Sequence, residues 1–136
     1  MNIEAELRAA LTGFSAVTAI VGARVWDEWF KNDTVPAVVF EIDNEDQENT
    51  LVGTGGLIFA DVNVICRANT RKAARALAEA VRINGTTPGT GLAGYTGRFD
   101  AWLEDRQNAR VPKNDGGNAH WYDVNMSFKV SWSEDQ

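Results

Sequence analysis

Apolar and polar side chains alternate along the chain from residue 122 to residue 132. The apolar positions are Tyr122, Val124, Met126, Phe128, Val130 and Trp132. The positions between them are Asp123, Asn125, Ser127, Lys129 and Ser131. Successive side chains of a strand point to opposite faces of a sheet, so this pattern predicts an antiparallel strand with one buried face. The end of the chain is therefore predicted to belong to the core.

The same kind of periodicity divides the rest of the chain into helices, strands and connections. Helical spacing of apolar residues predicts helices over residues 3–12, 15–21 and 70–83. Ser15 is the expected N-cap of the second helix, and Thr70 begins the third. Strands are predicted over residues 24–27, 36–43, 57–66 and 99–104. Polar and glycine-containing connections are predicted over residues 44–56, 85–97 and 112–118, the first as a long hairpin connection or mobile arm.

This grouping of helices and strands favours an α+β fold. We expect an antiparallel or mixed β-sheet with the helices packed on one of its faces. The apolar side of the last strand is then expected to contact Leu7, Leu11, Leu77 and Val81. A chain of 136 residues, 44% of them hydrophobic, suits one domain over residues 1–136.

Composition and net charge limit the kinds of molecule that this chain is expected to bind. A formal net charge of −6 argues against a general phosphate-binding surface. No apolar run approaches the roughly 20 residues that span a bilayer, and the first residues lack the pattern of a secretory signal. Cys66 is the only cysteine, so no intramolecular disulfide can form. We expect a soluble protein made in a reducing cytoplasm, with no membrane partner.

The glycine, histidine and cysteine positions indicate no catalytic set. Gly89, Gly91 and Gly94 match a dinucleotide-binding spacing, but they follow a predicted helix, whereas that motif follows a strand and opens a helix. His120 and Cys66 lie in no motif that pairs a nucleophile with a base.

The carboxylates are also better explained as surface charge. Asp100, Glu104 and Asp105 could furnish a pair for glycoside hydrolysis, yet strand alternation leaves two of them on a solvent-exposed face. The acidic segment after residue 40 lacks the turn glycine and bidentate glutamate of an EF-hand. We predict a protein that is not an enzyme and has no cofactor or metal. The alternative is a small hydrolase using Asp100, Glu104 or His120.

Three aromatic side chains are crowded into one short segment. Trp26, Trp29 and Phe30 lie within five residues, so they cannot all point into one small core. Aromatic side chains at the edge of a domain often belong to an interface. Packing beneath a neighbouring loop is an equally good explanation.

Charge is segregated along the sequence. The basic block around the third helix contains Arg67, Arg71, Lys72, Arg75 and Arg82. The acidic segment contains Glu41, Asp43, Glu45, Asp46 and Glu48. A subunit with one basic and one acidic flank can join head to tail into a closed ring, although a solvated helix face explains any single arginine. Acidic segments that face a channel would also repel DNA from its wall.

Several segments resemble, in order and spacing, the tail-completion or tail-terminator proteins of long-tailed bacteriophages and prophages. They comprise residues 2–11, 16–22, 24–26, 35–40, 60–66, 73–81 and 122–132. These are core and turn patterns rather than a chemical signature, and they span nearly the whole chain. The tryptophan-rich segment 26–30 and the glycine-rich segment 84–97 depart from the family pattern.

The resemblance implies a structural protein that forms a hexameric ring on the head-proximal end of the tail tube, after assembly in the bacterial host cytoplasm. Such a ring ends tube polymerisation and joins the tail to the head. The implied partners are further copies of the chain, the tail tube protein and the head completion or connector protein, while genomic DNA passes through the channel without specific binding. Another head–tail connector or a tail-tube subunit of the same particle is the alternative.

The residues expected to contact partners follow from the aromatic segment and the charge segregation. They are Trp26, Trp29, Phe30, Glu45, Asp46, Glu48, Arg71, Lys72 and Arg75.

Overall fold

The computed structural model describes residues 2–30, 34–48, 57–85, 90–113 and 120–133. In these residues the elements are, in chain order, α1 (Ile3–Gly13), α2 (Ser15–Val21), β1 (Val25–Asp27), β2 (Ala37–Glu48), β3 (Leu57–Ala68), α3 (Arg71–Ile83), β4 (Asp100–Pro112) and β5 (His120–Ser133). Each predicted helix and strand has its counterpart, and the predicted α+β fold class is confirmed.

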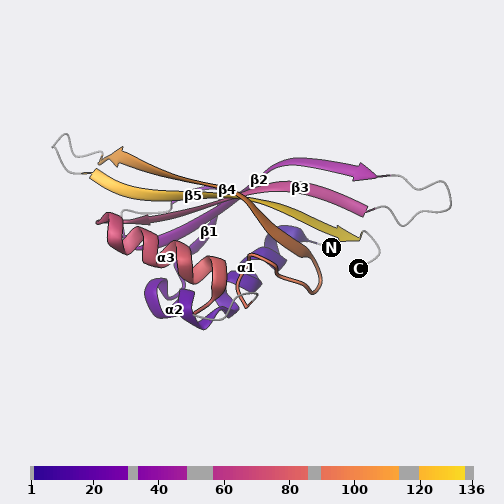
Figure 1. Cartoon of the computed structure of the whole chain (residues 1–136), viewed down its shortest axis with the longest axis horizontal. Helices are drawn as coiled ribbons and strands as arrows, with labels where there is room; N and C mark the ends of the chain where they lie inside the picture. Colours follow the sequence, from indigo (N-terminus) through magenta and orange to yellow (C-terminus); the bar gives the residue numbers. More distant parts are fainter. Residues whose placement is uncertain (1, 31–33, 49–56, 86–89, 114–119, 134–136) are drawn as a thin grey trace.

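The strands of the described residues form one five-stranded sheet in the order β1-β2-β3-β5-β4 (Figure 1). β1 pairs in parallel with β2, whereas all other neighbouring strands are antiparallel, so the sheet is mixed. β5, the strand with the regular alternation, lies between β3 and β4 and is paired along both edges. Helices cover only one of its two faces, so the two faces meet different environments, and this is the physical cause of the alternation.

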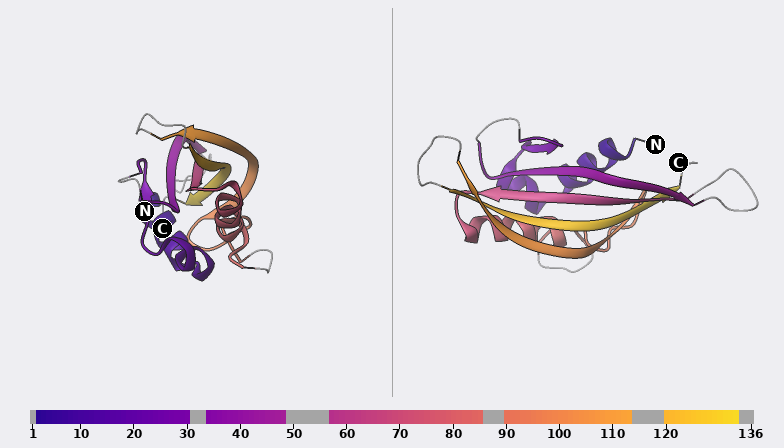
Figure 2. Two further views of the ribbon diagram at one scale, coloured as in Figure 1. Left: turned by 90° about the vertical axis from the view of Figure 1, so that its left-hand side faces the viewer. Right: turned by 90° about the horizontal axis from the view of Figure 1, so that it is seen from above.

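All three helices of the described chain lie on one face of the sheet, as Figures 1 and 2 show. We call this side the covered face and the opposite side the open face. Leu7, Leu11, Leu77 and Val81 have no exposed surface and belong to the same apolar cluster as Met126 of β5. α3 contacts β5 directly, so the predicted packing of Leu77 and Val81 on the last strand is confirmed, whereas α1 contacts α2 and β1 and shares the buried cluster with β5.

The helix ends show one correction. Thr70 caps α3 as predicted, because its side chain accepts a hydrogen bond from the Ala73 N–H at 3.1 Å. Ser15, in contrast, is the first residue of α2 rather than its N-cap. The side-chain oxygen of Asn84, at the end of α3, accepts the hydrogen bond of the Ala16 N–H at 3.0 Å. A residue distant in sequence thus satisfies an N-terminal amide group of α2, which local sequence could not reveal.

Two strands extend further than predicted. β2 continues through Glu48, so residues 44–48 are paired with β3 and are not part of a connection; residues 49–56 lie outside the described residues. β4 continues to Pro112, which was predicted to begin a loop, and residues 114–119 lie outside the described residues. The acidic residues of β2 have low strand propensity, but pairing with the neighbouring strand decides the conformation.

The segment before β4 is packed against the core rather than extended into solvent. Leu92 and Phe99 are buried, and the Leu92 N–H donates to the Val81 carbonyl oxygen at 2.8 Å. A Cβ atom at Gly91 would collide with the backbone of Arg82, so only glycine permits this close approach. The glycine spacing that resembles a dinucleotide-binding motif therefore includes a residue with a packing role at the end of α3.

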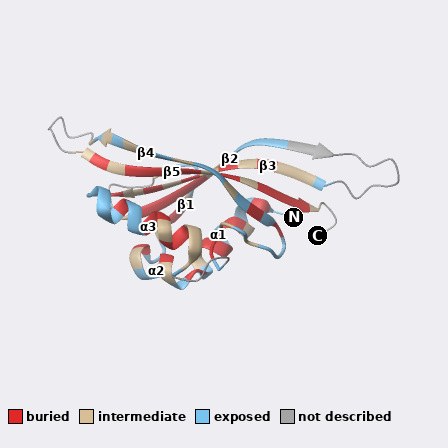
Figure 3. Cartoon of the chain, viewed as in Figure 1, coloured by how far each residue is buried: buried red, intermediate tan, exposed pale blue. Residues whose placement is uncertain are grey.

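The sheet is long and twisted, and its two long hairpins point to opposite ends of the molecule (Figures 1 and 2). The β2–β3 hairpin extends beyond the helices, whereas the β4–β5 hairpin lies near the first turn of α3. Buried residues follow β5 along its length and lie on the sides of the helices that face the sheet (Figure 3). A twelve-residue strand such as β2 or β3 spans about 40 Å, so the two ends are well separated.

Candidate assembly surfaces

The aromatic segment after β1 divides into an internal and an external part. The rings of Trp26 and Phe30 are half-buried and pack edge to face, with 6.4 Å between their centroids. The side chain of Trp29 is 73% exposed. Trp26 and Phe30 therefore pack within the molecule, and Trp29 is the exposed aromatic residue of the segment.

Arg67, on the open face, holds this aromatic cluster together. Its guanidinium carbon lies 4.1 Å from the Phe30 ring centroid and 4.7 Å from that of Trp121. The same guanidinium donates two hydrogen bonds to the Asp123 carboxylate, at 2.8 and 2.9 Å. Asp123 is only 6% exposed, although its position on the polar side of the alternation predicts solvent. Arg67 is thus used inside the molecule and is not part of a free basic surface.

The open-face pair was not identified as such from the sequence. Arg67 of β3 and Asp123 of β5 are direct neighbours across the sheet. Only the register of two strands that are far apart in sequence brings them together. The signal available in the sequence was a single carboxylate on the polar side of the last strand, which is not specific.

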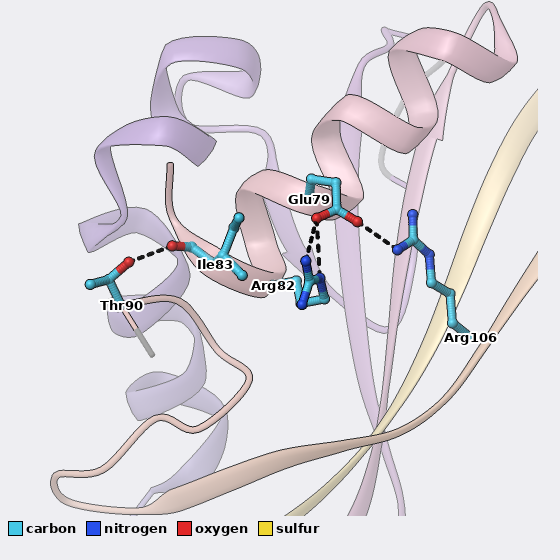
Figure 4. A network of polar contacts seen from close by, with 5 residues as sticks. All are labelled: Glu79, Arg82, Ile83, Thr90 and Arg106. Atoms are coloured by element: carbon cyan, nitrogen blue, oxygen red, sulfur yellow. Dashed lines mark hydrogen bonds and ion pairs between the residues drawn. The ribbon is translucent and has the colours of Figure 1, made fainter. Parts of the chain in front are cut away.

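Arg82, at the other end of the basic block, is also paired within the molecule. It donates to Glu79 at 2.7 Å, and Arg106 of β4 donates to the second oxygen of Glu79 at 2.6 Å (Figure 4). Hydrogen bonds from Arg82 and Arg106 lower the pKa of the Glu79 carboxyl, against the opposing effect of desolvation. This network connects the last turns of α3 to the edge strand β4.

The remaining basic residues of α3 are Arg71, Lys72 and Arg75, which we call the basic face of α3. All three are exposed, and none forms an ion pair with a carboxylate of the described residues. The exposed first turn of α3 is visible in Figure 3. The guanidinium of Arg71 lies 5.9 Å from the Tyr122 ring centroid, which places this face next to the β4–β5 hairpin.

The acidic segment lies at the opposite end of the sheet. Glu45 is exposed on β2, in the hairpin that extends beyond the helices (Figure 1). Asp46 and Glu48 belong to the same strand, where they lie opposite Phe59 and Leu57; their side chains are outside the described residues. The predicted acidic and basic contact residues are therefore not brought together within one subunit.

The residues of the hydrolase alternative do not converge. Asp100 and Glu104 are exposed on the edge strand β4, while His120 begins β5 opposite Pro112. Cys66 is fully buried, and desolvation raises the pKa of its thiol. Among the described residues, no three histidine, cysteine or acidic side chains are grouped so as to hold a metal ion.

A shallow polar groove crosses the middle of the open face. Its lining residues are Glu41, Asn63, Ile65, Asp105, Gln107, Asn125 and Ser127. The Ser127 hydroxyl donates to the Asn63 side-chain oxygen at 3.1 Å, so part of the groove is occupied by internal hydrogen bonds.

Among the helices of the described residues, none is long and apolar enough to cross a bilayer.

Comparisons with known proteins agree with this non-catalytic geometry. The model of the family described as "Tail completion protein gp17" matches residues 5–84. The chain belongs to this family of tail completion proteins. The match runs from α1 to the end of α3 and includes the aromatic segment, the acidic segment and the basic face of α3. The resemblance seen in the sequence is confirmed.

Solved structures support the fold over nearly the whole length. Thirty-three chains of solved structures are similar, among them one from a structure described as "Virion of native gene transfer agent (GTA) particle". It superimposes with a TM-score of 0.56 at 22% sequence identity, covering 93% of this chain and 94% of the other. At this identity the likeness shows the fold alone. A comparison with curated protein sequences finds no match.

Family membership decides the class of function. Tail completion proteins are structural components of the virion and not enzymes, so the prediction of a non-enzymatic protein is confirmed. The hydrolase alternative is wrong.

Proposed function

We propose that this tail completion protein forms a hexameric ring on the head-proximal end of the tail tube, ends tube polymerisation and joins the tail to the head connector. The observation that carries the proposal is the family match across residues 5–84. In this proposal residues 1–136 act as one domain, and the subunit assembles in the host cytoplasm before it becomes part of the virion. Its partners are other copies of the chain, the tail tube protein and the head completion protein.

The charge distribution supports a head-to-tail ring. The basic face of α3 and the acidic residues of β2 lie at opposite ends of the sheet (Figure 1). Contacts between unlike surfaces of identical subunits repeat in one direction, and they close into a ring when the rotation between neighbours allows it. In the proposal Arg71, Lys72 and Arg75 of one subunit face Glu45, Asp46 and Glu48 of the next.

The aromatic segment supports a separate contact, with the tail tube or the connector. Trp29 is a large apolar side chain left in solvent, and exposed tryptophan residues are frequent anchors at protein interfaces. On either side of it in the sequence, Trp26 and Phe30 pack against each other, and Phe30 also packs against Arg67. All three then act as one unit, with Trp29 as the side chain that meets the partner.

The net charge of −6 is consistent with a channel through which DNA passes without specific binding. A surface that binds DNA would release counterions through clustered lysine and arginine residues. In this proposal the acidic residues instead keep the duplex away from the channel wall.

Ring formation is tested with a charge reversal. The variant Arg71→Glu, Lys72→Glu, Arg75→Glu should have a smaller solution mass than the wild type in light scattering at low salt, because three attractive contacts become repulsive. The single substitution Arg8→Glu, at an exposed position of α1, is the control and should leave the mass unchanged. Reversal of Glu45, Asp46 and Glu48 to lysine in the same chain should restore the larger mass. An unchanged mass in the first variant would reject the charge contact.

The position in the particle is tested by removing the protein. Electron microscopy of particles assembled without it should show unjoined heads and overlong tail tubes. Tubes of normal length that lack heads would instead favour a head–tail connector, and an absence of tubes would favour a tube subunit.

A further inference from the structure

The edge strand β2 is covered over only the first part of its length. β1 pairs with β2 over three residues, from Val38 to Phe40. The Val38 N–H donates to the Arg24 carbonyl oxygen at 3.0 Å, and the Glu28 N–H donates to the Phe40 carbonyl oxygen at 2.9 Å. Beyond Phe40, no backbone hydrogen bond reaches this edge from any residue that the structure describes. We call residues 41–48 the β2 open edge.

The other edge strand, β4, is covered in the same partial way. The Ala101 N–H donates to the Tyr95 carbonyl oxygen at 3.0 Å, and the Ala101 carbonyl oxygen accepts from the Gly94 N–H at 2.9 Å. No backbone bond from the described residues reaches the second half of this edge. We call residues 106–112 the β4 open edge. The two open edges lie at opposite ends of the molecule, in the two long hairpins (Figure 1).

The register shows which backbone groups point outward on the β2 open edge. Successive residues of a strand direct their N–H and C=O groups to alternate edges. The backbone groups of Val38 point toward β1 and away from β3. The even-numbered residues of β3 lie opposite the residues of β2 that point away from them, so their own backbone groups point toward β5. The register between β3 and β5 is unbroken, so this holds along the whole of β3. Glu45 and Gln47 lie opposite two of these residues, Ala60 and Ile58. Their backbone groups therefore point away from the sheet.

On the β4 open edge, the register also shows which backbone groups point outward. Arg106, Asn108 and Arg110 lie opposite even-numbered residues of β5, which bond toward β3. Their backbone groups therefore point outward. Pro112, the next residue in this series, has no N–H, and proline is tolerated at a strand position whose N–H would face away from the sheet.

The two open edges carry opposite charge. The β2 open edge contains five carboxylates and no basic residue: Glu41, Asp43, Glu45, Asp46 and Glu48. The β4 open edge contains no acidic residue; its Arg106 is paired with Glu79 of α3, and Arg110 and the following Lys113 add positive charge. The basic face of α3 lies at the same end. Like edges of two copies therefore repel each other, whereas unlike edges attract.

We propose that the β2 open edge of one copy adds to the β4 open edge of the next copy, so that the sheets of neighbouring subunits become continuous. This inference rests on the proposed ring and specifies its contact. Eight residues of one edge and seven of the other are similar in length, and each offers outward backbone groups at alternate positions. Each added copy covers the open edge that it binds and presents an edge of the same kind at its other end, so the addition repeats until the ring closes.

Cross-linking between two singly substituted proteins tests this pairing. Asn44 and Gln107 are uncharged, exposed and on the same open face, since their partners across the sheet are Asp61 and Asn125. Asn44→Cys and Gln107→Cys are purified separately, mixed at low salt and treated with a short bismaleimide. The native Cys66 is fully buried and does not compete. The mixture should yield a cross-linked dimer, and each variant alone should yield almost none.

The outcomes separate this inference from the proposed function. Equal dimer yields from each variant alone would overturn it, because like edges would then be in contact. A ring mass in light scattering without a mixed product would overturn the edge pairing and leave the ring intact. Neither ring nor mixed product would overturn both.

Amide hydrogen exchange provides a second test that needs no substitution. In the monomer the outward amides of Asn108 and Arg110 should exchange rapidly, while the inward amides of Gln107 and Ala109 are protected by β5. Assembly should slow exchange at the outward amides by roughly tenfold or more, and should leave the inward amides unchanged. Unaltered exchange at both outward amides in the assembled protein would contradict the inference.

Discussion

The covered and open faces of the same sheet obey different rules. On the covered face, apolar residues of the four long strands and of the helices form one buried cluster. On the open face, a buried ion pair, two aromatic rings and a polar groove replace the apolar layer. Most of the stabilising apolar burial therefore lies on the covered face. The open face and the strand edges leave groups that can be satisfied by other subunits.

Aromatic truncation on the two faces should give the largest difference. Phe128→Ala, at a residue 1% exposed on the covered face, should lower the free energy of unfolding by about 3–5 kcal/mol. Trp102→Ala, on the open face and 42% exposed, should change it by less than about 1 kcal/mol. Denaturant unfolding of both variants measures the contrast. Similar losses at the two positions would show that the open face also contributes to the core.

Breaking the open-face ion pair should have the next largest effect. Arg67→Ala leaves the Asp123 carboxylate buried without its partner, so we expect a loss of about 3 kcal/mol in the free energy of unfolding. The double variant Arg67→Met, Asp123→Leu removes both charges and should recover most of this loss. Thermal and denaturant unfolding measure both. A loss below about 1 kcal/mol in Arg67→Ala would indicate that solvent replaces the guanidinium.

Breaking the Glu79 network at the margin of the covered face should have the smallest effect on the free energy of unfolding. This effect should depend on pH. Because the folded-state pKa of Glu79 lies below its ordinary value of 4.5, the network stabilises the protein above that pH and loses its effect as the pH falls through the folded-state pKa. Glu79→Gln should cost less than about 1 kcal/mol at neutral pH, since the side chain is 39% exposed.

Unfolding measured from pH 7 to pH 3 tests this. The difference in stability between the wild type and Glu79→Gln should shrink below pH 4.5. Arg106→Gln removes one of the two donors and should reduce the same pH dependence. A difference that stays constant with pH would assign the loss to packing rather than charge.

Local pattern was sufficient for the elements of the covered face. Helical spacing around Leu7 and Leu77 and alternation around Met126 each report a buried side, and burial against the same core is what the pattern encodes. Local pattern failed where a distant strand or helix made the decision. Residues 44–48 form a strand because β3 pairs with them, and Asn84 rather than Ser15 satisfies the start of α2.

For the candidate contact residues, too, local sequence decided one part and the tertiary structure the other. The sequence identified the aromatic segment and the two charged segments by composition alone. It could not separate Trp29 from its two neighbours, or Arg67 and Arg82 from the basic face of α3, because pairing with Asp123 and Glu79 depends on register and helix position. The roles of the candidate contact residues in contacts between subunits stay predictions.

The sequence by itself determined which sides of the helices and of the last strand are buried, and it contains no catalytic motif, because periodicity and residue type are local properties. Only the tertiary structure decided which charges are already paired, which backbone edges lack a partner and at which ends of the sheet they lie. These depend on strand order and register, which bring together residues that are far apart in the chain.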